Sequence, residues 1–281
     1  MELHKLIKSL FQTSIYTLED TKKGLTNRNF LLTVNQKQFI IRIPYQDSHQ
    51  VVDRKQEVYA LEIIKQTDLD VPLIYFNEVS GIKITAYIPN LEEFQDSQKQ
   101  DKIERVARLM KKLHNLPNVS KIDFQPVETW KRYYANVHDP IYDLSSYTSI
   151  IEDVQTLHNP KVLCHNDWVS GNILLGTHKD YLIDFEYAAN NDPLFDIMSF
   201  LTENNIDDEN DRQRFYQIYF DNITPIIKKQ LAIWESFHNL LWCTWAMMMY
   251  ESRKDDVFRQ IAHDKYCALT KSFHKKNAYY T

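Results

Sequence analysis

Two aspartates and an asparagine stand out as residues that could carry chemistry. Asp167 and Asn172 lie in a polar loop between the short apolar runs 161–163 and 173–175, and Asp184 directly follows a third apolar run, 181–183. Because these runs are short and bounded by turn residues, they are predicted to be buried strands. The three side chains would then lie together at one end of a small sheet.

The types and the order of these residues suit phosphoryl transfer, which depends on positioning and charge neutralisation more than on covalent chemistry. One carboxylate must orient the attacking hydroxyl group and accept its proton, and Asp167 fits that role. A second carboxylate and an amide oxygen must hold Mg²⁺, which prefers oxygen ligands, and Asp184 with Asn172 fit that role. A lone aspartate at a strand end is usually a surface turn residue, but kinases use this ordered set.

The same stretch carries a family resemblance. His165-Asn166-Asp167 through Asn172, followed by Ile-Asp-Phe-Glu-Tyr at 183–187, resembles the aminoglycoside phosphotransferase and choline kinase superfamily. The Phe-Glu-Tyr-Ala continuation and the later Trp242 and Trp245 resemble its choline/ethanolamine kinase branch, which includes bacterial choline kinases. The resemblance implies a small-molecule kinase that uses ATP and Mg²⁺ and acts on the hydroxyl group of choline. It also implies a protein-kinase-like fold over nearly the whole chain.

Two segments are expected to contact ATP. Gly24, Thr26 and Asn27 lie in a turn between predicted strands, where backbone N–H groups can cover phosphates. The turn resembles the Gly-Leu-Thr-Asn loop of choline kinases, although alone it would read as an ordinary hairpin turn. By analogy with the fold, the backbone of the strand end that holds Ala86 and Ile88 would bind adenine.

Arg42 is a charge in an apolar strand, which is costly unless it is paired. If Ile41 and Ile43 face the core, Arg42 faces the cleft, where kinases place a phosphate-contacting cation. Glu57 on the next predicted helix is its expected partner. The alternative is an exposed pair of Glu57 with Arg54, which would contribute little.

The acceptor side rests on aromatic residues. Trp242 and Trp245 are three residues apart on a predicted helix and share a face, and Tyr250 falls near it. Aromatic faces attract quaternary ammonium groups, with roughly 0.5–2 kcal/mol for each contact. Tryptophans on a buried helix more often pack in a core, and the resemblance of the Trp-x-x-Trp-Ala segment to the family favours a headgroup box. The resemblance also assigns Glu203 to the acid near the cation.

Two further residues are expected to support the catalytic loop. Asp196 should brace the loop rather than touch substrate, and His165 should hold backbone, as that position does in kinase-like folds. The sequence assigns no role to Trp168.

Composition narrows the class of protein. The 281 residues, 43% of them hydrophobic, suffice for one large domain or two lobes, and the net charge of −5 argues against nucleic acid as a partner. Three widely spaced cysteines suggest free thiols in a reducing compartment. Neither a signal peptide nor an apolar run near the roughly 20 residues of a membrane span is evident. A cytoplasmic protein without a membrane partner is expected, and its oligomeric state is not predicted.

The chain changes character near Pro89. A short amphipathic helix opens the chain, and the following strands are predicted at 14–18, 29–34, 38–43, 73–76 and 82–88, with a helix at 51–66. The helices after Pro89 are predicted at 98–113, 127–137, 147–157, 193–204, 208–220, 225–250 and 256–274. We therefore expect an α+β, two-lobed fold. A nucleotide-binding lobe at 1–88 would contain a five-stranded antiparallel sheet, and a mostly helical lobe at 89–281 would carry catalysis and acceptor binding.

Three alternatives remain open at this point. A related kinase could act on ethanolamine, thiamine, an amino sugar or an aminoglycoside, since a primary ammonium needs hydrogen-bond acceptors more than aromatic walls. A nucleotide-binding pseudokinase or scaffold would keep the fold without the reaction, although Asp167, Asn172 and Asp184 are all present. A purely structural helical protein would leave the clustered motif unexplained.

Overall fold

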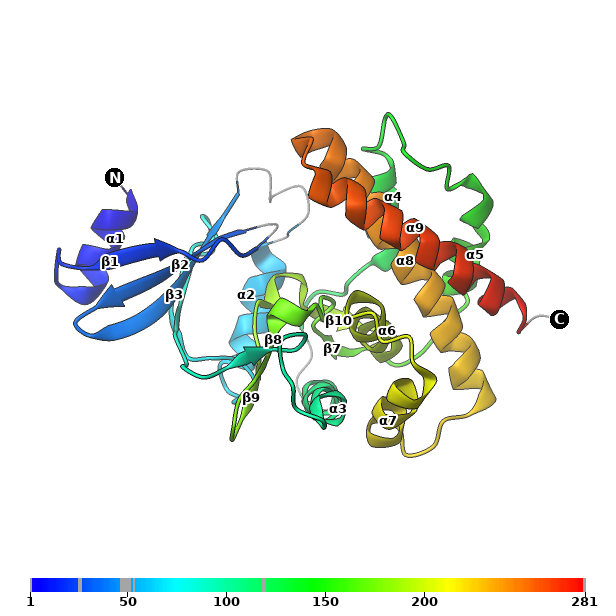
Figure 1. The fold of residues 1–281 in the computed structure, drawn as a ribbon, viewed down its shortest axis with the longest axis horizontal. Coiled ribbons are helices and arrows are strands. Elements are labelled where there is room, and N and C mark those ends of the chain that lie inside the picture. The colour runs from blue at the N-terminus through cyan, green and yellow to red at the C-terminus, as the bar shows by residue number, and fades with distance from the viewer. Residues whose placement is uncertain (1, 25–26, 46–51, 53, 118–119, 280–281) are drawn as a thin grey trace.

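The structure, a computed structural model, describes residues 2–24, 27–45, 52, 54–117 and 120–279 (Figure 1). The helices of this part are α1 (Glu2–Phe11), α2 (Arg54–Ile64), α3 (Lys102–His114), α4 (Pro126–Tyr134), α5 (Ser149–Gln155), α6 (Pro193–Glu203), α7 (Glu209–Tyr219), α8 (Pro225–Arg253) and α9 (Asp256–Asn277). The strands are β1 (Thr17–Asp20), β2 (Asn27–Val34), β3 (Lys37–Pro44), β4 (Leu73–Phe76), β5 (Lys83–Ala86), β6 (Glu92–Glu93), β7 (Val162–Cys164), β8 (Ile173–Leu175), β9 (Asp180–Leu182) and β10 (Ala189–Asn191). Short 3₁₀ helices lie at η2 (Ser145–Tyr147), η3 (Ser170–Asn172) and η4 (Phe185–Tyr187).

The predicted five-stranded sheet is present and antiparallel, with the strand order β1-β2-β3-β5-β4. Its first strand begins at Thr17, three residues later than predicted. Side chains alternate along β3 because successive residues of a strand point to opposite faces. Ile41 is buried in a cluster with Leu32, Ile84 and Ile7 of α1, while Arg42 points into a cleft on the other face.

The helix α2 packs away from this sheet core. Its buried side chains Ala60, Leu61 and Ile64 belong to a second, larger cluster that also contains the apolar side chains of α3 to α9. In Figure 1, α2 accordingly lies between the sheet and the helices. Although α2 falls within the first 88 residues, its apolar face ties the sheet-rich part to the helical part.

The catalytic stretch contains two small sheets, so the prediction of a single small sheet is wrong. β7 pairs with β10, whereas β8 pairs with β6 and β9. The extra strands β6 (Glu-Glu) and β10 (Ala-Asn-Asn) carry no apolar pattern, because backbone hydrogen bonds alone define them. The loop that holds Asp167 and Asn172 crosses between the two sheets.

Side-chain caps fix the start of several helices in the helical part. Asp192 accepts a hydrogen bond from the backbone of Leu194 at the start of α6, and Thr224 accepts one from Ile227 at the start of α8. In both helices a proline follows the cap and has a backbone shape suited to the first turn. The long helix α8 crosses this part and α9 packs along it (Figure 1).

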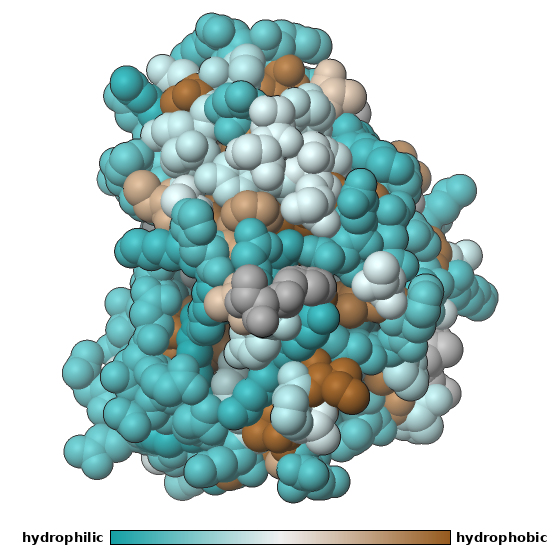
Figure 2. Space-filling model, turned by 90° about the vertical axis from the view of Figure 1, so that its right-hand side faces the viewer, coloured by the Kyte–Doolittle hydropathy of each residue, from teal (hydrophilic) through white to brown (hydrophobic). Residues whose placement is uncertain are grey.

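The end of the molecule around the C-terminus is mostly hydrophilic, with only scattered hydrophobic residues (Figure 2). The apolar faces of the helices there are turned inward. The three cysteines are free, as predicted, with Cys164 and Cys243 buried and Cys267 exposed. Among the described residues, no helix combines the length and the apolar character that a membrane span requires.

The sheet core gives a stability prediction. Ile41 is 0% exposed, so Ile41→Ala should lower the free energy of unfolding by about 2–5 kcal/mol through lost burial and a residual cavity. Ile15→Ala is the matched control because that side chain is 85% exposed, and its effect should stay within about 0.5 kcal/mol. Urea unfolding followed by circular dichroism measures both. Equal effects of the two changes would contradict the proposed core.

Candidate active site

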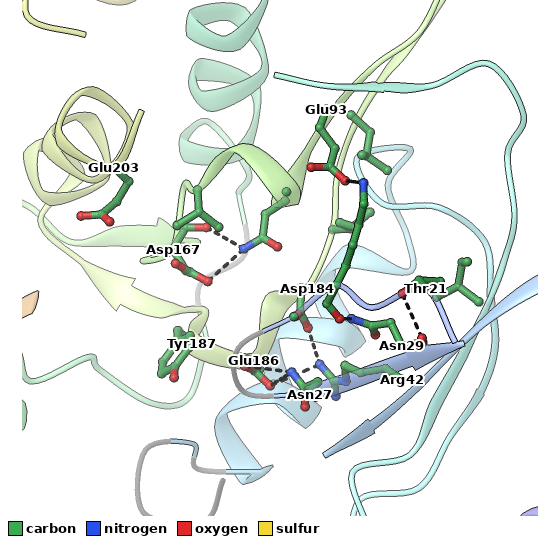
Figure 3. Close-up of a pocket in the computed structure, with 18 of the residues that line it drawn as sticks. Thr21, Asn27, Asn29, Arg42, Glu93, Asp167, Asp184, Glu186, Tyr187 and Glu203 are labelled. Carbon is green, nitrogen blue, oxygen red and sulfur yellow. Dashed lines mark hydrogen bonds and ion pairs between the residues drawn. The ribbon is translucent and has the colours of Figure 1, made fainter. Parts of the chain in front are cut away.

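A cleft of about 1030 Å³ lies between the five-stranded sheet and the helical part. Asp167 and Asp184 both point into it, with Glu203 on the side of Asp167 and Arg42 on the side of Asp184 (Figure 3). The sequence-predicted residues that line the cleft are Gly24, Asn27, Arg42, Ala86, Ile88, Asp167, Asn172, Asp184, Glu203, Trp242 and Trp245. One concave surface therefore gathers groups that are up to about two hundred residues apart in the chain.

Asp167 and Asn172 are held together on the floor of the cleft. The amide Nδ2 of Asn172 donates to the backbone carbonyl and to the Oδ2 carboxylate oxygen of Asp167, both at 2.9 Å. This pair of hydrogen bonds fixes the rotamer of Asp167. A catalytic carboxylate must be held in this way for its oxygen to reach an acceptor hydroxyl group.

Buried hydrogen bonds brace the loop from below, as predicted. The carboxylate of Asp196, on α6, accepts from the backbone N–H groups of His165 and Asn166, each at 2.8 Å. Its Oδ2 also lies 3.0 Å from Nε2 of His114. His165 connects the loop to the next strand, with Nε2 2.9 Å from the carbonyl oxygen of Ile183. Asp196 and His165 hold backbone and do not line the cleft.

The environment of Asp167 suits a proton acceptor. Loss of contact with water, together with the negative charges of Asp184, Glu186 and Glu203, raises the pKa of the Asp167 carboxyl well above its usual range. The hydrogen bond from Asn172 opposes this shift only in part. A carboxylate with a raised pKa is a stronger base toward a hydroxyl proton than one in water.

Arg42 is the centre of an ion network at the other end of the catalytic set. Its side chain is 4% exposed, and Nη2 donates to Oε1 of Glu57 at 2.6 Å, so the predicted pair is present. Nη1 donates to Oδ1 of Asp184 and lies 3.5 Å from Oε2 of Glu186. Although burial disfavours its charge, these three carboxylates raise the pKa of Arg42, which therefore stays protonated. Its partners also fix the position of the guanidinium group.

Asp184 remains ionised in this network. Burial favours its neutral form, but Arg42 and Lys83 outweigh burial and lower the pKa of the Asp184 carboxyl. Lys83 Nζ lies 3.8 Å from Oδ1 of Asp184. The backbone of Asp184 has φ +66° and ψ +62°, in the left-handed region that non-glycine residues seldom occupy. Such strain persists where surrounding contacts impose it, which is common at functional sites.

The donor set between the two aspartates fits a divalent cation. Asp184 offers an ionised carboxylate, and Asn172 has its amide nitrogen committed to Asp167, which leaves its carbonyl oxygen for a cation. Burial and the charge of Asp184 raise the pKa of Glu186 to about 7. A divalent cation beside these acids would oppose both effects and favour the ionised form of Glu186.

The loop before β2 is placed at the mouth of the cleft. Gly24 has φ +105°, and a Cβ atom there would lie 2.5 Å from the carbonyl oxygen of Asn27, so the turn requires glycine. The amide Nδ2 of Asn27 donates to the carboxylate oxygens of Glu186 at 3.1 and 3.3 Å. Thr26 lies outside the described residues.

The strand end expected to bind adenine is partly committed to the sheet. The N–H group of Ala86 donates to the carbonyl oxygen of Pro72 at 2.9 Å, and that of Tyr87 donates to Gln38 at 3.1 Å. Sheet pairing therefore uses these two N–H groups, and the expected adenine contact would fall to other backbone groups of this strand end. Ala86 and Ile88 still line the cleft.

The acceptor end of the cleft is aromatic and charged. Trp242 and Trp245 line it with their rings nearly perpendicular, at an interplanar angle of 87° and a centroid distance of 5.7 Å. Glu203 lines it too, but its Oε1 is already 2.6 Å from Nζ of Lys265. Tyr250 does not line the cleft, and Lys254 Nζ lies over its ring instead. Eight helical residues turn Tyr250 by about 80° from Trp242, which is enough to leave the shared face.

Several lining residues were not anticipated as parts of the site, and three of them matter for its charge: Lys83, Glu186 and Lys265. Lys83 carried a usable signal, since it is a charge between two isoleucines in a strand, as Arg42 is. Glu186 was seen as part of the motif but was given no role. Lys265 shares the buried stripe of α9 with Ala262 and Leu269, so a lysine at helical spacing among apolar residues was the signal there.

Comparison with known proteins agrees with this geometry. A sequence model of the family described as choline/ethanolamine kinase matches residues 18–233. Protein LicA of Haemophilus influenzae is 26% identical over 247 residues, which cover 81% of this chain and 91% of that protein. A protein of Arabidopsis thaliana described as a probable ethanolamine kinase is 23% identical over 237 residues, which cover 71% of this chain and 61% of that protein.

The fold is also shared with a solved structure. The choline kinase LicA from Streptococcus pneumoniae matches with a TM-score of 0.81 and 24% identity, over 96% of this chain and 100% of that chain. The chain thus has the two-lobed, kinase-like α+β fold predicted from its sequence. Since the family match spans most of the chain and includes Asp167, Asn172 and Asp184, this protein belongs to the choline/ethanolamine kinase family and is an ATP-dependent phosphotransferase with an alcohol acceptor.

Proposed function

We propose that the enzyme transfers the γ-phosphoryl group of ATP to the hydroxyl group of choline and so forms phosphocholine. The observation that carries this proposal is the perpendicular pair Trp242 and Trp245 in the same cleft as Asp167. Two ring faces at a right angle can contact a trimethylammonium group from two sides. The raised pKa of Asp167 supports its role as the proton acceptor.

In this proposal Asp167 orients the choline hydroxyl group and accepts its proton. The hydroxyl oxygen forms a bond to the γ-phosphorus, the bond from that phosphorus to the β–γ bridging oxygen breaks, and ADP leaves. Asn172 keeps Asp167 in position through the hydrogen bonds at 2.9 Å. The enzyme thus contributes positioning and proton transfer rather than a covalent intermediate.

The nucleotide would occupy the end of the cleft on the sheet side. We assign phosphate contacts to Arg42, set in place by Glu57, and to the loop that contains Gly24, Thr26 and Asn27. Asn172 and Asp184 would hold Mg²⁺, which neutralises phosphate charge when bound. Residues 1–88 would bind most of the nucleotide, and residues 89–281 would supply catalysis and the acceptor site. The use of ATP and the free cysteines support a cytoplasmic location for the enzyme.

Ethanolamine is the second candidate acceptor, because the family description names both alcohols. A primary ammonium carries N–H donors that need carboxylate or carbonyl partners, whereas trimethylammonium carries none. The aromatic pair favours choline. The carboxylate of Glu203 would favour ethanolamine, but Lys265 already occupies it.

The first test removes the proposed base. Asp167→Asn should lower kcat by about 10²–10⁴-fold while ATP affinity stays nearly unchanged, because proton acceptance is lost and the nucleotide contacts remain. Asp221→Asn is the control, since that side chain is 99% exposed and far along the chain. Transfer of labelled phosphate from ATP to choline is measured. Full activity of Asp167→Asn would remove the proposed role.

The second test concerns the acceptor. Trp245→Ala should raise KM for choline by about tenfold with little change in KM for ATP, through loss of one cation–π face. Trp245→Phe keeps an aromatic face and should lose less. Wild-type enzyme should also have a higher kcat/KM for choline than for ethanolamine. An unchanged choline KM in Trp245→Ala would count against the aromatic box.

The third test uses pH. The raised pKa of Asp167 means that its ionised, proton-accepting form is lost as pH falls, and at a higher pH than for a carboxyl in water. The profile of kcat/KM for choline between about pH 5 and pH 9 should therefore show an acidic limb well above pH 4. A profile that stays flat down to about pH 5 would contradict the raised pKa.

A further inference from the structure

A lysine lies inside the acceptor end of the cleft, where a cationic substrate is expected to bind. Lys265 is 8% exposed, and its Nζ donates to Oε1 of Glu203 at 2.6 Å and to the carbonyl oxygen of Thr202 at 3.3 Å. All three residues line the same cleft as Trp242 and Trp245. Lys265 and the two tryptophans lie beyond residues 18–233, which match the family.

The positive charge of Lys265 acts on His238, a buried residue that holds one of the two tryptophans in place. Burial and then the positive charge of Lys265 lower the pKa of His238 to about 3. Nδ1 of His238 accepts the hydrogen bond that Nε1 of Trp242 donates at 3.2 Å. Four charged groups line the end of the cleft near the tryptophans: Glu203 from α6, Lys265 and Asp264 from α9, and Asp167 from the loop after β7.

We propose that Lys265 neutralises Glu203 within the acceptor site and thereby makes the enzyme select a quaternary ammonium alcohol over a primary ammonium alcohol. The inference rests on the proposed function, since it concerns the acceptor of that same reaction. Lys265 is in this view a specificity-determining residue: it neutralises the carboxylate and takes Oε1, an oxygen that an –NH₃⁺ group would otherwise use.

The selectivity follows from the hydrogen-bonding capacity of the two headgroups. A primary ammonium has three N–H donors, and burying them without acceptors is costly. Trimethylammonium has no N–H donor, so it loses no hydrogen bond when Lys265 holds the carboxylate, and it keeps the attraction of the ring faces. Specificity is a difference of two affinities, and an occupied carboxylate weakens one of them selectively.

Removal of the lysine tests the inference directly. Lys265→Met keeps an unbranched side chain of similar length and frees Glu203. Both cations should gain from the freed negative charge, but ethanolamine should gain about tenfold more than choline, the factor of one hydrogen bond to a charged group that only ethanolamine can donate. Lys271→Met is the matched control on the exposed side of the same helix, and it should leave both affinities unchanged. Dissociation constants are measured by calorimetry without ATP, and thermal unfolding reports on folding.

A second pair of variants keeps the test decisive if Lys265→Met folds poorly. Glu203→Gln leaves Lys265 charged beside the tryptophans, so choline affinity should fall about tenfold by repulsion of like charges. Adding Lys265→Met to Glu203→Gln should restore choline affinity and should not produce tighter ethanolamine binding. A double variant that binds choline as weakly as Glu203→Gln would overturn the inference, because Glu203 would then contact the headgroup directly.

Binding and turnover separate the two ideas. Wild-type enzyme that binds choline more tightly than ethanolamine but phosphorylates neither would overturn the proposed function. The affinities of the Lys265 and Glu203 variants would then still test whether Lys265 sets the selectivity of binding. Wild-type enzyme that phosphorylates choline, combined with an unchanged ratio of affinities in Lys265→Met, would overturn the inference and leave the proposed function standing. Equal or undetectable binding of both amines to the wild type would overturn the inference as well.

Discussion

The site depends on one buried cation that joins the sheet to the catalytic floor. Arg42 lies on β3, and its guanidinium contacts Glu57 from α2 and Asp184 and Glu186 from the segment after β9. A charge that is 4% exposed is tolerated only with such partners. Because these acids come from different parts of the fold, the network sets where Asp184 lies relative to the five-stranded sheet. The pair that would bind magnesium is thereby placed by an ion network and not only by its own loop.

A second constraint acts on Asp167, the proposed proton acceptor. Asp167 cannot hold itself in position, because its loop has no regular backbone pairing of its own between β7 and η3. Asp196 accepts two backbone N–H groups of the loop at 2.8 Å, and Asn172 fixes the carboxylate from above. The base is therefore preorganised by hydrogen bonds to groups that do not react. This arrangement fits a reaction in which positioning contributes more than covalent chemistry.

The sequence identified the site residues whose roles follow from their spacing within one motif. It missed ion pairs between residues that are far apart in the chain. Asp167, Asn172 and Asp184 could be identified because their roles follow from spacing within about twenty residues. Glu203 and Lys265 form an ion pair although they are 62 residues apart in the chain. Arg42 and Lys83 lie opposite each other on neighbouring strands and share acidic partners. A periodic sequence pattern does not predict pairs of this kind. The five-stranded sheet was predictable from alternation.

The missed elements have the same cause. The strands β6 and β10 are polar, so a search for apolar runs does not find them. One small sheet was therefore expected where the structure has two. Tyr250 was misplaced because a residue eight positions along a helix is near the starting face but not on it. An error of about 80° in the direction of a side chain around the helix axis matters little for a core residue. It determines whether a side chain points into a cleft or away from it.

The charged side chains differ between the two ends of the cleft. At the sheet end, the cations Arg42 and Lys83 stand among acids and suit a polyanion with its metal ion. At the helical end, an acid is cancelled by Lys265 beside two ring faces, which suits a cation without donors. Asp167 lies between these two environments, and the acids on both sides, Asp184 and Glu203, contribute to the rise in its pKa. The same charges that would sort the two proposed substrates to opposite ends therefore also add to the basicity that burial gives the carboxylate between them.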